Sequence, residues 1–161
     1  MEAVIFVGIQ GSGKTTFYRE RFAETHVRIS MDMLRSRRRE AILVDACLRA
    51  GQPFVVDNTS PLAADRARYV GPARAAGFRV VAVLFRATPR EAIVRNQRRA
   101  GRAVVPVPAI LDTLRRLEEP SLEEGFDAVY AVTLTEGGVY AVEAPGRGEG
   151  CAEGGEPPPP R

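Results

Sequence analysis

The residues with the clearest chemical meaning form one short segment from Gly8 to Thr15, which reads Gly-Ile-Gln-Gly-Ser-Gly-Lys-Thr. It fits G-x-x-x-x-G-K-[ST] at every fixed position, a pattern typical of a loop that wraps the phosphates of a nucleoside triphosphate. Of the 23 basic residues, Lys14 is the only lysine and the other 22 are arginines. We attribute this exception to space, because a slim ammonium fits among phosphates where a wide, planar guanidinium does not.

The segments around this loop suit the same chemistry. An apolar run at 3–7 predicts a buried strand before the loop, and residues from Thr15 onward predict a helix after it. This order aims backbone N–H groups and a helix N-terminus at an anion. We therefore expect ATP and Mg²⁺ as cofactors, with the Thr15 hydroxyl on the metal. The expected nucleotide contacts are Gly8, Gln10, Gly11, Ser12, Gly13, Lys14, Thr15 and Thr16.

Composition excludes several other classes of protein. The 161 residues suffice for one compact domain, and no run approaches the roughly 18 apolar residues of a membrane-spanning helix. His26 is the only histidine, which excludes a histidine-based metal cluster or a Ser-His-Asp triad. Two cysteines are too few for a disulfide framework. No basic stretch precedes the first apolar run, so a strand is expected there in place of a signal peptide, in a cytoplasmic protein without membrane contact.

The net charge of +3 hides an asymmetry along the chain. Residues 19–102 hold 18 arginines against 8 acidic residues, whereas residues 103–161 hold 4 arginines against 11 acidic residues. A basic segment after a phosphate loop suits two polyanions, the nucleotide and an acceptor such as nucleic acid. The alternative is a general enrichment in arginine on solvated helix faces.

Strands and helices are expected to alternate around this site. Strands are predicted at 27–30, 53–56, 78–85 and 126–134 besides the first, and residues 139–142 are expected to pair with the last one. Helices are predicted at 31–50, at 60–77 with an interruption at Gly71-Pro72, from a Thr88 capping box onward, and at 109–119. The expected fold is α/β, a three-layer P-loop NTPase fold. It has a mostly parallel sheet of about five strands, helices on both faces and a small arginine-rich lid. Residues 1–143 form this domain, and the Gly/Glu/Pro-rich residues 144–161 are predicted to be a disordered tail.

Acidic residues follow two of the predicted strands, at the sheet edge that faces the ligand in open α/β folds. Asp32 could orient or deprotonate an attacking hydroxyl, and Arg35 is expected to share a helix face with it. Alternatively, Asp32 is a helix N-cap. Asp57 could hold a magnesium-bound water or contact the acceptor, or it could simply begin a turn. Asn58 and Thr59 make that turn more polar than capping requires.

Five ordered segments together resemble the kinase domain of polynucleotide 5′-kinases, over roughly residues 3–134. They are 11–16, 30–35, 57–59, 66–70 with 73–77, and 118–120 with 124–126. The resemblance implies phosphate transfer from ATP to the 5′-hydroxyl of DNA or RNA, so a nucleic acid 5′ end is the expected partner. It implies that Asp32 is the general base and that Arg35 contacts an acceptor phosphate, with Asp57, Asn58 and Thr59 beside the acceptor. The Asp-x-Asp signature of the phosphatase domain in the repair enzymes does not occur, so we predict no 3′-phosphatase activity.

An arginine-rich segment before Val105-Pro106 completes this resemblance and corresponds to a lid. A mobile arginine that closes over the γ-phosphate would supply charge only in the closed state. Arg98 is the preferred catalytic candidate, with Arg102 as a further nucleotide contact, and Arg95 and Arg99 compete with Arg98. The alternative for each is a solvated arginine on a helix face.

Two other functions stay open at this point. The same parts would serve a kinase that phosphorylates a small molecule such as a sugar acid, a nucleoside or an antibiotic. They would also serve a nucleotide-dependent switch, which would bind nucleotide tightly without an acceptor. Asp32 beside Arg35 disfavours the switch, because a switch needs no carboxylate to activate a hydroxyl.

Overall fold

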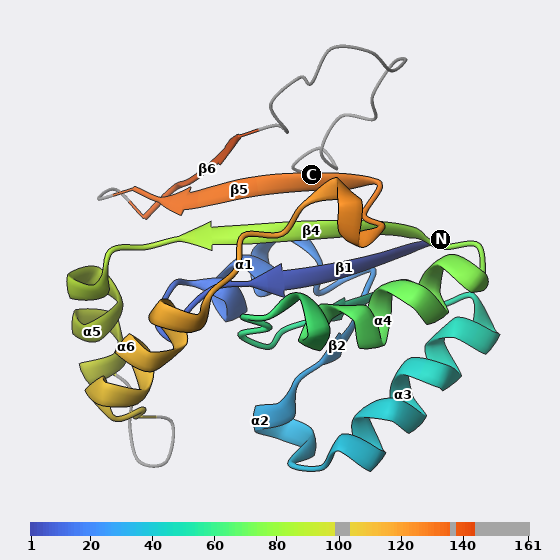
Figure 1. Cartoon of the computed structure of the whole chain (residues 1–161), viewed down its shortest axis with the longest axis horizontal. Coiled ribbons are helices and arrows are strands. Elements are labelled where there is room, and N and C mark those ends of the chain that lie inside the picture. The colour runs from blue at the N-terminus through green and yellow to red at the C-terminus, as the bar shows by residue number, and fades with distance from the viewer. Residues whose placement is uncertain (99–103, 136–137, 144–161) are drawn as a thin grey trace.

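The fold is built on one six-stranded sheet in the strand order β2-β3-β1-β4-β5-β6 (Figure 1). The computed structural model describes residues 1–98, 104–135 and 138–143. The strands are β1 (Glu2–Val7), β2 (Val27–Ile29), β3 (Phe54–Val56), β4 (Arg79–Arg86), β5 (Ala128–Leu134) and β6 (Tyr140–Glu143). All neighbouring pairs are parallel except β5 and β6, which run antiparallel. Parallel strands end at the same edge, so the segments that follow β1, β2 and β3 meet there.

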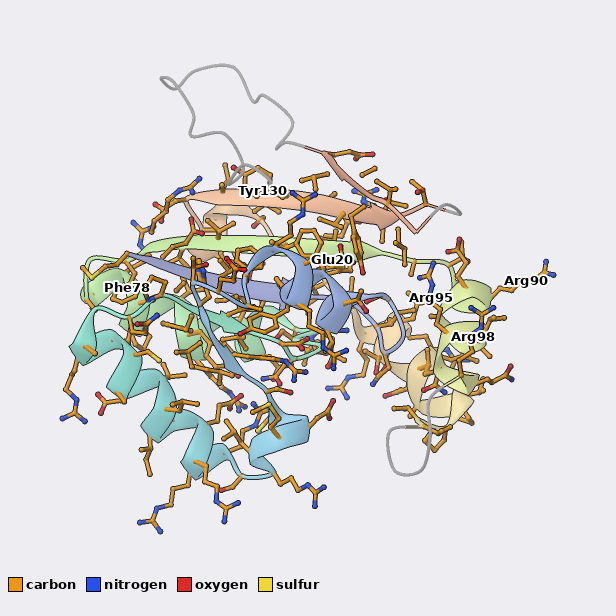
Figure 2. The ribbon with its side chains drawn as sticks, turned by 180° about the vertical axis from the view of Figure 1, so that it is seen from behind. Glu20, Phe78, Arg90, Arg95, Arg98 and Tyr130 are labelled. Carbon is orange, nitrogen blue, oxygen red and sulfur yellow. The ribbon has the colours of Figure 1, made fainter. Side chains whose placement is uncertain are left out.

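Helices cover both faces of this sheet. The helices are α1 (Lys14–Arg21), α2 (Met31–Leu34), α3 (Arg37–Ala50), α4 (Ala63–Ala75), α5 (Pro89–Gln97) and α6 (Val107–Arg116), with a short 3-10 turn, η2 (Leu122–Glu124). Figure 1 shows α3 and α4 in front of the sheet, and the reverse view in Figure 2 shows α1 on the other side. Helices α5 and α6 lie beyond the ends of the strands (Figure 1).

The core follows from the alternation of side chains along the strands. Ala3 and Ile5 of β1 face a buried cluster with α3 and α4, whereas Val4 and Phe6 face a cluster that contains Phe17 of α1. Both faces of the central strands are therefore apolar, as expected of a parallel sheet covered on both sides. A third, small cluster joins the phosphate loop to α5 and α6 through Ile9, Ala92 and Ile110. This cluster attaches the predicted lid region to the loop.

The predicted P-loop α/β fold is confirmed, with six strands where about five were expected. The predicted helix at 31–50 is wrong as a single element, because the backbone of Arg35 turns into the left-handed region at φ 53° and ends α2. A new helix, α3, then begins after Ser36. Arg35 is the cap of α2 and not a neighbour of Asp32 on a continuous helix face. Periodicity along a sequence does not reveal such a break between two helical segments.

The second correction concerns α4. Ser60 does not cap it, since the helix begins three residues later at Ala63, and Gly71-Pro72 does not interrupt it. Pro72 is exposed, whereas Val70 and Ala73 on either side are buried against the sheet. Burial of this face outweighs the one backbone hydrogen bond that proline removes. Helix α6 also begins earlier than expected, within the predicted break at 104–108.

Other expectations fall partly or wholly outside the described residues. The tail at 144–161 and the lid segment 99–103 with Arg99 and Arg102 lie there. In the part of the chain that the structure describes, no helix is long and apolar enough to cross a bilayer.

Candidate active site

A cavity of about 910 Å³ lies where the phosphate loop meets the carboxyl ends of β2 and β3. Its walls come from the loop, from α2 and the start of α3, from the segment after β3, and from α4 and α6. The predicted site residues that line it are Gln10, Gly11, Ser12, Gly13, Lys14, Thr15, Asp32, Arg35, Asp57, Asn58 and Thr59. Gly8, Thr16 and Arg98 are not among the lining residues. The topology thus gathers residues that are far apart in the sequence.

The phosphate loop needs glycine at two positions. Gly11 and Gly13 have φ angles of 79° and 97°, which lie in the left-handed region that side chains disfavour. A Cβ atom on Gly11 would also lie 2.3 Å from the carbonyl oxygen of Ala92 in α5. The loop is therefore held closely between β1 and α5.

Lys14 is buried at the first position of α1, with only 8% of its surface exposed. Its Nζ donates hydrogen bonds to the carbonyl oxygens of Gly8 at 2.8 Å and Ile9 at 2.7 Å. The Ser12 hydroxyl lies 3.5 Å from the same nitrogen. The ammonium is thus held close to the backbone of the loop.

Thr15 and Asp57 meet beside the loop, although they are 42 residues apart. The Thr15 hydroxyl donates to Oδ2 of Asp57 at 2.9 Å, and the Asp57 side chain is almost fully buried. Arg28 of β2 contacts both. Its Nε and Nη2 lie 2.7 and 2.6 Å from the same carboxylate oxygen, and Nη2 donates to Thr15 Oγ1 at 3.3 Å. The buried carboxylate is therefore neutralised by an arginine that our sequence analysis did not single out.

Asp32 lies on α2, where its exposed side chain lines the cavity. The N-cap of α2 is Ser30, so the alternative interpretation of Asp32 as an N-cap is wrong. Arg35 lines the same cavity from the end of α2, because its left-handed backbone turns the chain there. The two residues therefore share the cavity for a different reason than the predicted common helix face.

Asn58 and Thr59, in the segment after β3, form hydrogen bonds with neighbouring parts of the protein. The Asn58 side chain accepts a hydrogen bond from the Met31 backbone N–H at 2.9 Å and donates to Glu40 at 2.7 Å. The Thr59 carbonyl accepts a hydrogen bond from the Gly8 N–H at 3.0 Å, which ties the end of β3 to the phosphate loop. The Asn58 amide is thus engaged at both ends, whereas Thr59 contributes its backbone carbonyl.

Among the lid arginines, the geometry distinguishes Arg95 from Arg98. Arg98 caps the end of α5 and is exposed. Arg95 lies on the side of α5 turned toward α1, whereas Arg90 points away from the body of the protein (Figure 2). The Nη1 atom of Arg95 is buried, and no residue in the described part of the chain forms a hydrogen bond with it.

Tyr140 is hydrogen-bonded to the phosphate loop and lies near the charge of Arg95. Burial raises the pKa of the Tyr140 hydroxyl, and the nearby positive charge of Arg95 acts in the opposite direction. The same hydroxyl donates to the Gly13 carbonyl at 2.8 Å. The charge of Arg95 therefore acts on a hydroxyl that is bonded to the phosphate loop.

Comparison with known families gives a match over most of the chain. A family profile described as an AAA domain matches residues 4–120. The chain belongs to this AAA-domain family. The matched range begins in β1 and ends after α6, so it contains the phosphate loop, Asp32, Asp57 and the described lid residues of this family member.

Solved structures with the same fold include two sugar-directed kinases. A gluconokinase from Sinorhizobium meliloti 1021 is 18% identical with a TM-score of 0.58, over 84% of this chain and 83% of that one. A sugar kinase from Janibacter sp. HTCC2649 is 19% identical with a TM-score of 0.62, over 81% and 85%. Kti12 from Chaetomium thermophilum, in complex with ADP-AlF3, is 17% identical with a TM-score of 0.62, over 84% and 92%. This AAA-domain chain therefore has a P-loop kinase-like fold.

Sequence reasoning missed several residues of the site in this AAA-domain protein. Arg37 at the start of α3 and Arg116 at the end of α6 line the cavity, and Glu40 and Tyr69 lie beside Asn58. The sequence signal of Arg37, Glu40 and Arg116 is membership in arginine-rich or helical segments, whereas Tyr69 lies in the segment 66–70 of the family resemblance. Nothing in the spacing of residues 37 and 116 shows that β-strand topology brings them to one cavity.

Proposed function

We propose that this protein is an ATP-dependent phosphotransferase that transfers the γ-phosphate to a hydroxyl group of a small anionic molecule. The observation that supports this proposal is the composition of one cavity. It joins the phosphate loop to a carboxylate, Asp32, that is accompanied by three guanidinium side chains, Arg35, Arg37 and Arg116. A cavity with this composition can hold a triphosphate at one end and a negatively charged alcohol at the other.

The triphosphate is held by the loop and α1. Backbone N–H groups and the N-terminus of α1 face the anion, and the Lys14 ammonium adds a positive charge inside the loop. Arg95 is the better placed of the described lid arginines for the γ-phosphate, because it lies on the side of α5 turned toward α1 and its buried Nη1 has no hydrogen-bond partner among the described residues. Charge fixed in this way stabilises the transferred group in the transition state.

The residues beside the loop also fit Mg²⁺. Two oxygen ligands of one octahedral Mg²⁺, each about 2.1 Å from the ion, lie about 3 Å apart. Thr15 Oγ1 and Asp57 Oδ2 lie 2.9 Å apart, and both are hard oxygen donors. Among the described residues no group of three or more His, Cys, Asp or Glu side chains could hold a metal, which suits an ion that takes its remaining ligands from phosphates and water. Bound there, Mg²⁺ would neutralise charge on the phosphates.

Arg28 should compete with this metal, because its guanidinium contacts the same two oxygens. We expect Arg28→Met to raise the affinity of the nucleotide-free protein for Mn²⁺, used as a probe of the Mg²⁺ site, at least about tenfold. Binding can be followed by electron paramagnetic resonance of free Mn²⁺. The control is Arg79→Met, which removes the same charge from an ion pair with Glu2 away from the cavity. Equal Mn²⁺ affinity in the two variants would contradict the competition.

Asp32 acts on the acceptor. Its carboxylate accepts the hydroxyl proton while the hydroxyl oxygen forms its bond to the γ-phosphorus and the bond from that phosphorus to the β-phosphate oxygen breaks. Arg35 and the other two guanidinium groups bind the anionic group of the acceptor by charge-assisted hydrogen bonds. A sugar acid satisfies both demands, because it has hydroxyls next to a carboxylate. The gluconokinase and the sugar kinase of the same fold are consistent with this choice.

A 5′-hydroxyl end of DNA or RNA is the second candidate acceptor. The resemblance of residues 3–134 to polynucleotide 5′-kinases and the surplus of arginine over residues 19–102 favour it. Its next phosphate would take the place of the carboxylate beside Arg35. Salt distinguishes the two acceptors, because the KM for an oligonucleotide rises steeply with ionic strength and the KM for a singly charged sugar acid changes little.

The test is transfer of labelled γ-phosphate from ATP to a panel of sugar acids and 5′-hydroxyl oligonucleotides. We expect Asp32→Asn to lower kcat about 10²- to 10⁴-fold while the Kd for ATP stays unchanged, because only proton transfer is lost. Asp45→Asn is the control, since Asp45 is an exposed acid on α3 outside the cavity. Tight ATP binding without transfer to any acceptor would support a nucleotide-dependent switch instead. Full transfer by Asp32→Asn would exclude this residue as the base.

A further inference from the structure

The helix that carries Asp32 is short and only partly buried. Helix α2 has four residues, and none of its side chains is fully buried, although Leu34 packs against the core cluster that contains Val44 of α3. So short a helix is not stable by itself in water. Its N-cap Ser30 makes no side-chain capping hydrogen bond either. Something outside α2 must therefore hold it at the edge of the cavity.

A side chain from the segment after β3 supplies a hydrogen bond to this helix. Oδ1 of Asn58 accepts from the Met31 N–H, the first N–H of α2, at 2.9 Å. The other end of the same amide donates from Nδ2 to Glu40 Oε1 at 2.7 Å and to the Tyr69 hydroxyl at 3.3 Å. Asn58 thus connects α2 to a buried carboxylate on α3.

Glu40 is the centre of this network, with only 3% of its surface exposed. Its two oxygens accept from Asn58, from the Tyr69 hydroxyl at 2.8 Å, and from Arg37 Nη1 at 2.7 Å. A buried carboxylate is tolerated only when it is paired and hydrogen-bonded, and these three donors satisfy that condition. Burial, with Glu40 beside it, raises the pKa of Tyr69 to about 12, so the phenol is a donor at neutral pH.

This network ends in the cavity at three points. Arg37, Asn58 and Tyr69 all line the cavity that holds Asp32, while Glu40 lies behind them. An apolar residue at position 40 would fill the same space without orienting any of them. The carboxylate is therefore suited to fixing the direction in which the Asn58 amide points, with its oxygen toward α2.

We propose that Glu40 and Asn58 are positioning residues that hold α2, and through it Asp32, at the cavity edge by a continuous hydrogen-bond chain from α3. The catalytic consequence rests on the role proposed above for Asp32. The ordering of α2 does not depend on that role. Glu40 fixes the Asn58 amide, the amide fixes the Met31 N–H, and that N–H fixes the first turn of α2.

The first experiment measures amide hydrogen exchange by NMR at residues 31–35 of the nucleotide-free protein. We expect Asn58→Ala and Glu40→Gln each to speed exchange there about tenfold, the factor that corresponds to loss of one hydrogen bond. The control is Val44→Ala, which removes core contacts from the same helix as Glu40 but leaves the network intact. It should lower Tm without changing exchange at α2. Unchanged exchange in both network variants would overturn the proposal.

A reversed pair of side chains gives a sharper test. Asn58→Asp alone places a second carboxylate against Glu40 and should loosen α2. In the double variant Glu40→Gln with Asn58→Asp, the amide of residue 40 can donate to the new carboxylate, whose other oxygen still accepts from Met31 N–H. We expect the exchange rate at residues 31–35 to return to within about twofold of the wild-type rate. The double variant would then exchange more slowly than either single variant. If the double variant exchanged as fast as the two single effects combined predict, the proposed hydrogen-bond chain would be wrong.

Kinetics separate positioning from general stability. With an active acceptor, we expect Asn58→Ala to lower kcat about tenfold to a hundredfold with the Kd for ATP unchanged, whereas Val44→Ala keeps the wild-type kcat below its Tm. If no acceptor is phosphorylated even by wild type, the proposed function fails, and the exchange data still decide the positioning role. If the exchange data support the network and kcat does not fall in an active enzyme, the link to Asp32 is refuted.

Discussion

Lys14→Arg is expected to lower phosphate transfer at least about a hundredfold, although the substitution keeps the positive charge. The Lys14 ammonium lies 2.8 and 2.7 Å from two carbonyl oxygens of the loop, in a buried position. A guanidinium is planar and wider, so it would have to displace the backbone of Gly8 and Ile9 to reach the same place. The loop would then lose the shape that presents its N–H groups to the phosphates.

The measurements for this prediction are kcat with the active acceptor and the Kd for ATP by isothermal titration calorimetry. Lys14→Met, which removes the charge but keeps the chain length, should be at least as impaired. Arg49→Lys is a matched control for the exchange of the two cations, because Arg49 is an exposed residue outside the cavity that pairs with Asp45 on the same helix. If Lys14→Arg kept more than about a tenth of the wild-type kcat, steric exclusion would not explain why this position alone retains lysine.

The second large effect concerns stability and comes from Arg66, whose side chain is fully buried. Its guanidinium forms two hydrogen bonds with the Glu124 carboxylate at 2.7 and 2.6 Å. It also donates to the carbonyl oxygens of Ser60, Pro61 and Glu118 at 3.0, 3.2 and 3.0 Å. We expect Arg66→Met to lower the free energy of unfolding by about 3–5 kcal/mol, because it leaves a carboxylate and three carbonyls without their partner.

Urea unfolding monitored by circular dichroism would measure this loss. Arg68→Met is the control, since Arg68 is an exposed neighbour whose nearest contact with Asp65 is 3.9 Å, and such a surface pair contributes about 1 kcal/mol or less. The double variant Arg66→Met with Glu124→Leu should recover part of the loss, because it removes the unpaired carboxylate as well. A loss below about 1 kcal/mol in Arg66→Met would show that water replaces the guanidinium.

Arg66 also connects segments that are far apart in the sequence. No motif in the sequence links three of these segments to the phosphate loop, namely 66–70, 118–120 and 124–126. In the structure, one guanidinium ties α4 to the connection between α6 and β5 and to the carbonyls of Ser60 and Pro61, which line the cavity. These segments therefore support the part of the cavity wall that Ser60 and Pro61 form.

The phosphate loop, the order of strands and helices and the Thr88 capping box were predictable from sequence, because each depends on residues close together in the chain. Thr88 Oγ1 accepts from the Glu91 N–H and Glu91 accepts from the Thr88 N–H, as the local pattern requires. The placement of Asp32 and Asp57 at the carboxyl edge of the sheet was also predictable, since parallel strands align their ends.

Contacts between distant segments decided the rest. The break at Arg35 depends on a backbone turn that positions Arg35 at the cavity, and local periodicity at 31–50 conceals it. Arg28 reaches Thr15 and Asp57 only because β2 pairs with β3 in a particular register. Glu40 reaches Asn58 because α3 packs across the sheet edge. Sequence alone determined the phosphate loop and the two strand-end aspartates, because these depend on short-range patterns. The tertiary structure decided which side chains meet, because hydrogen bonds and ion pairs depend on distances in space that separation along the chain does not encode.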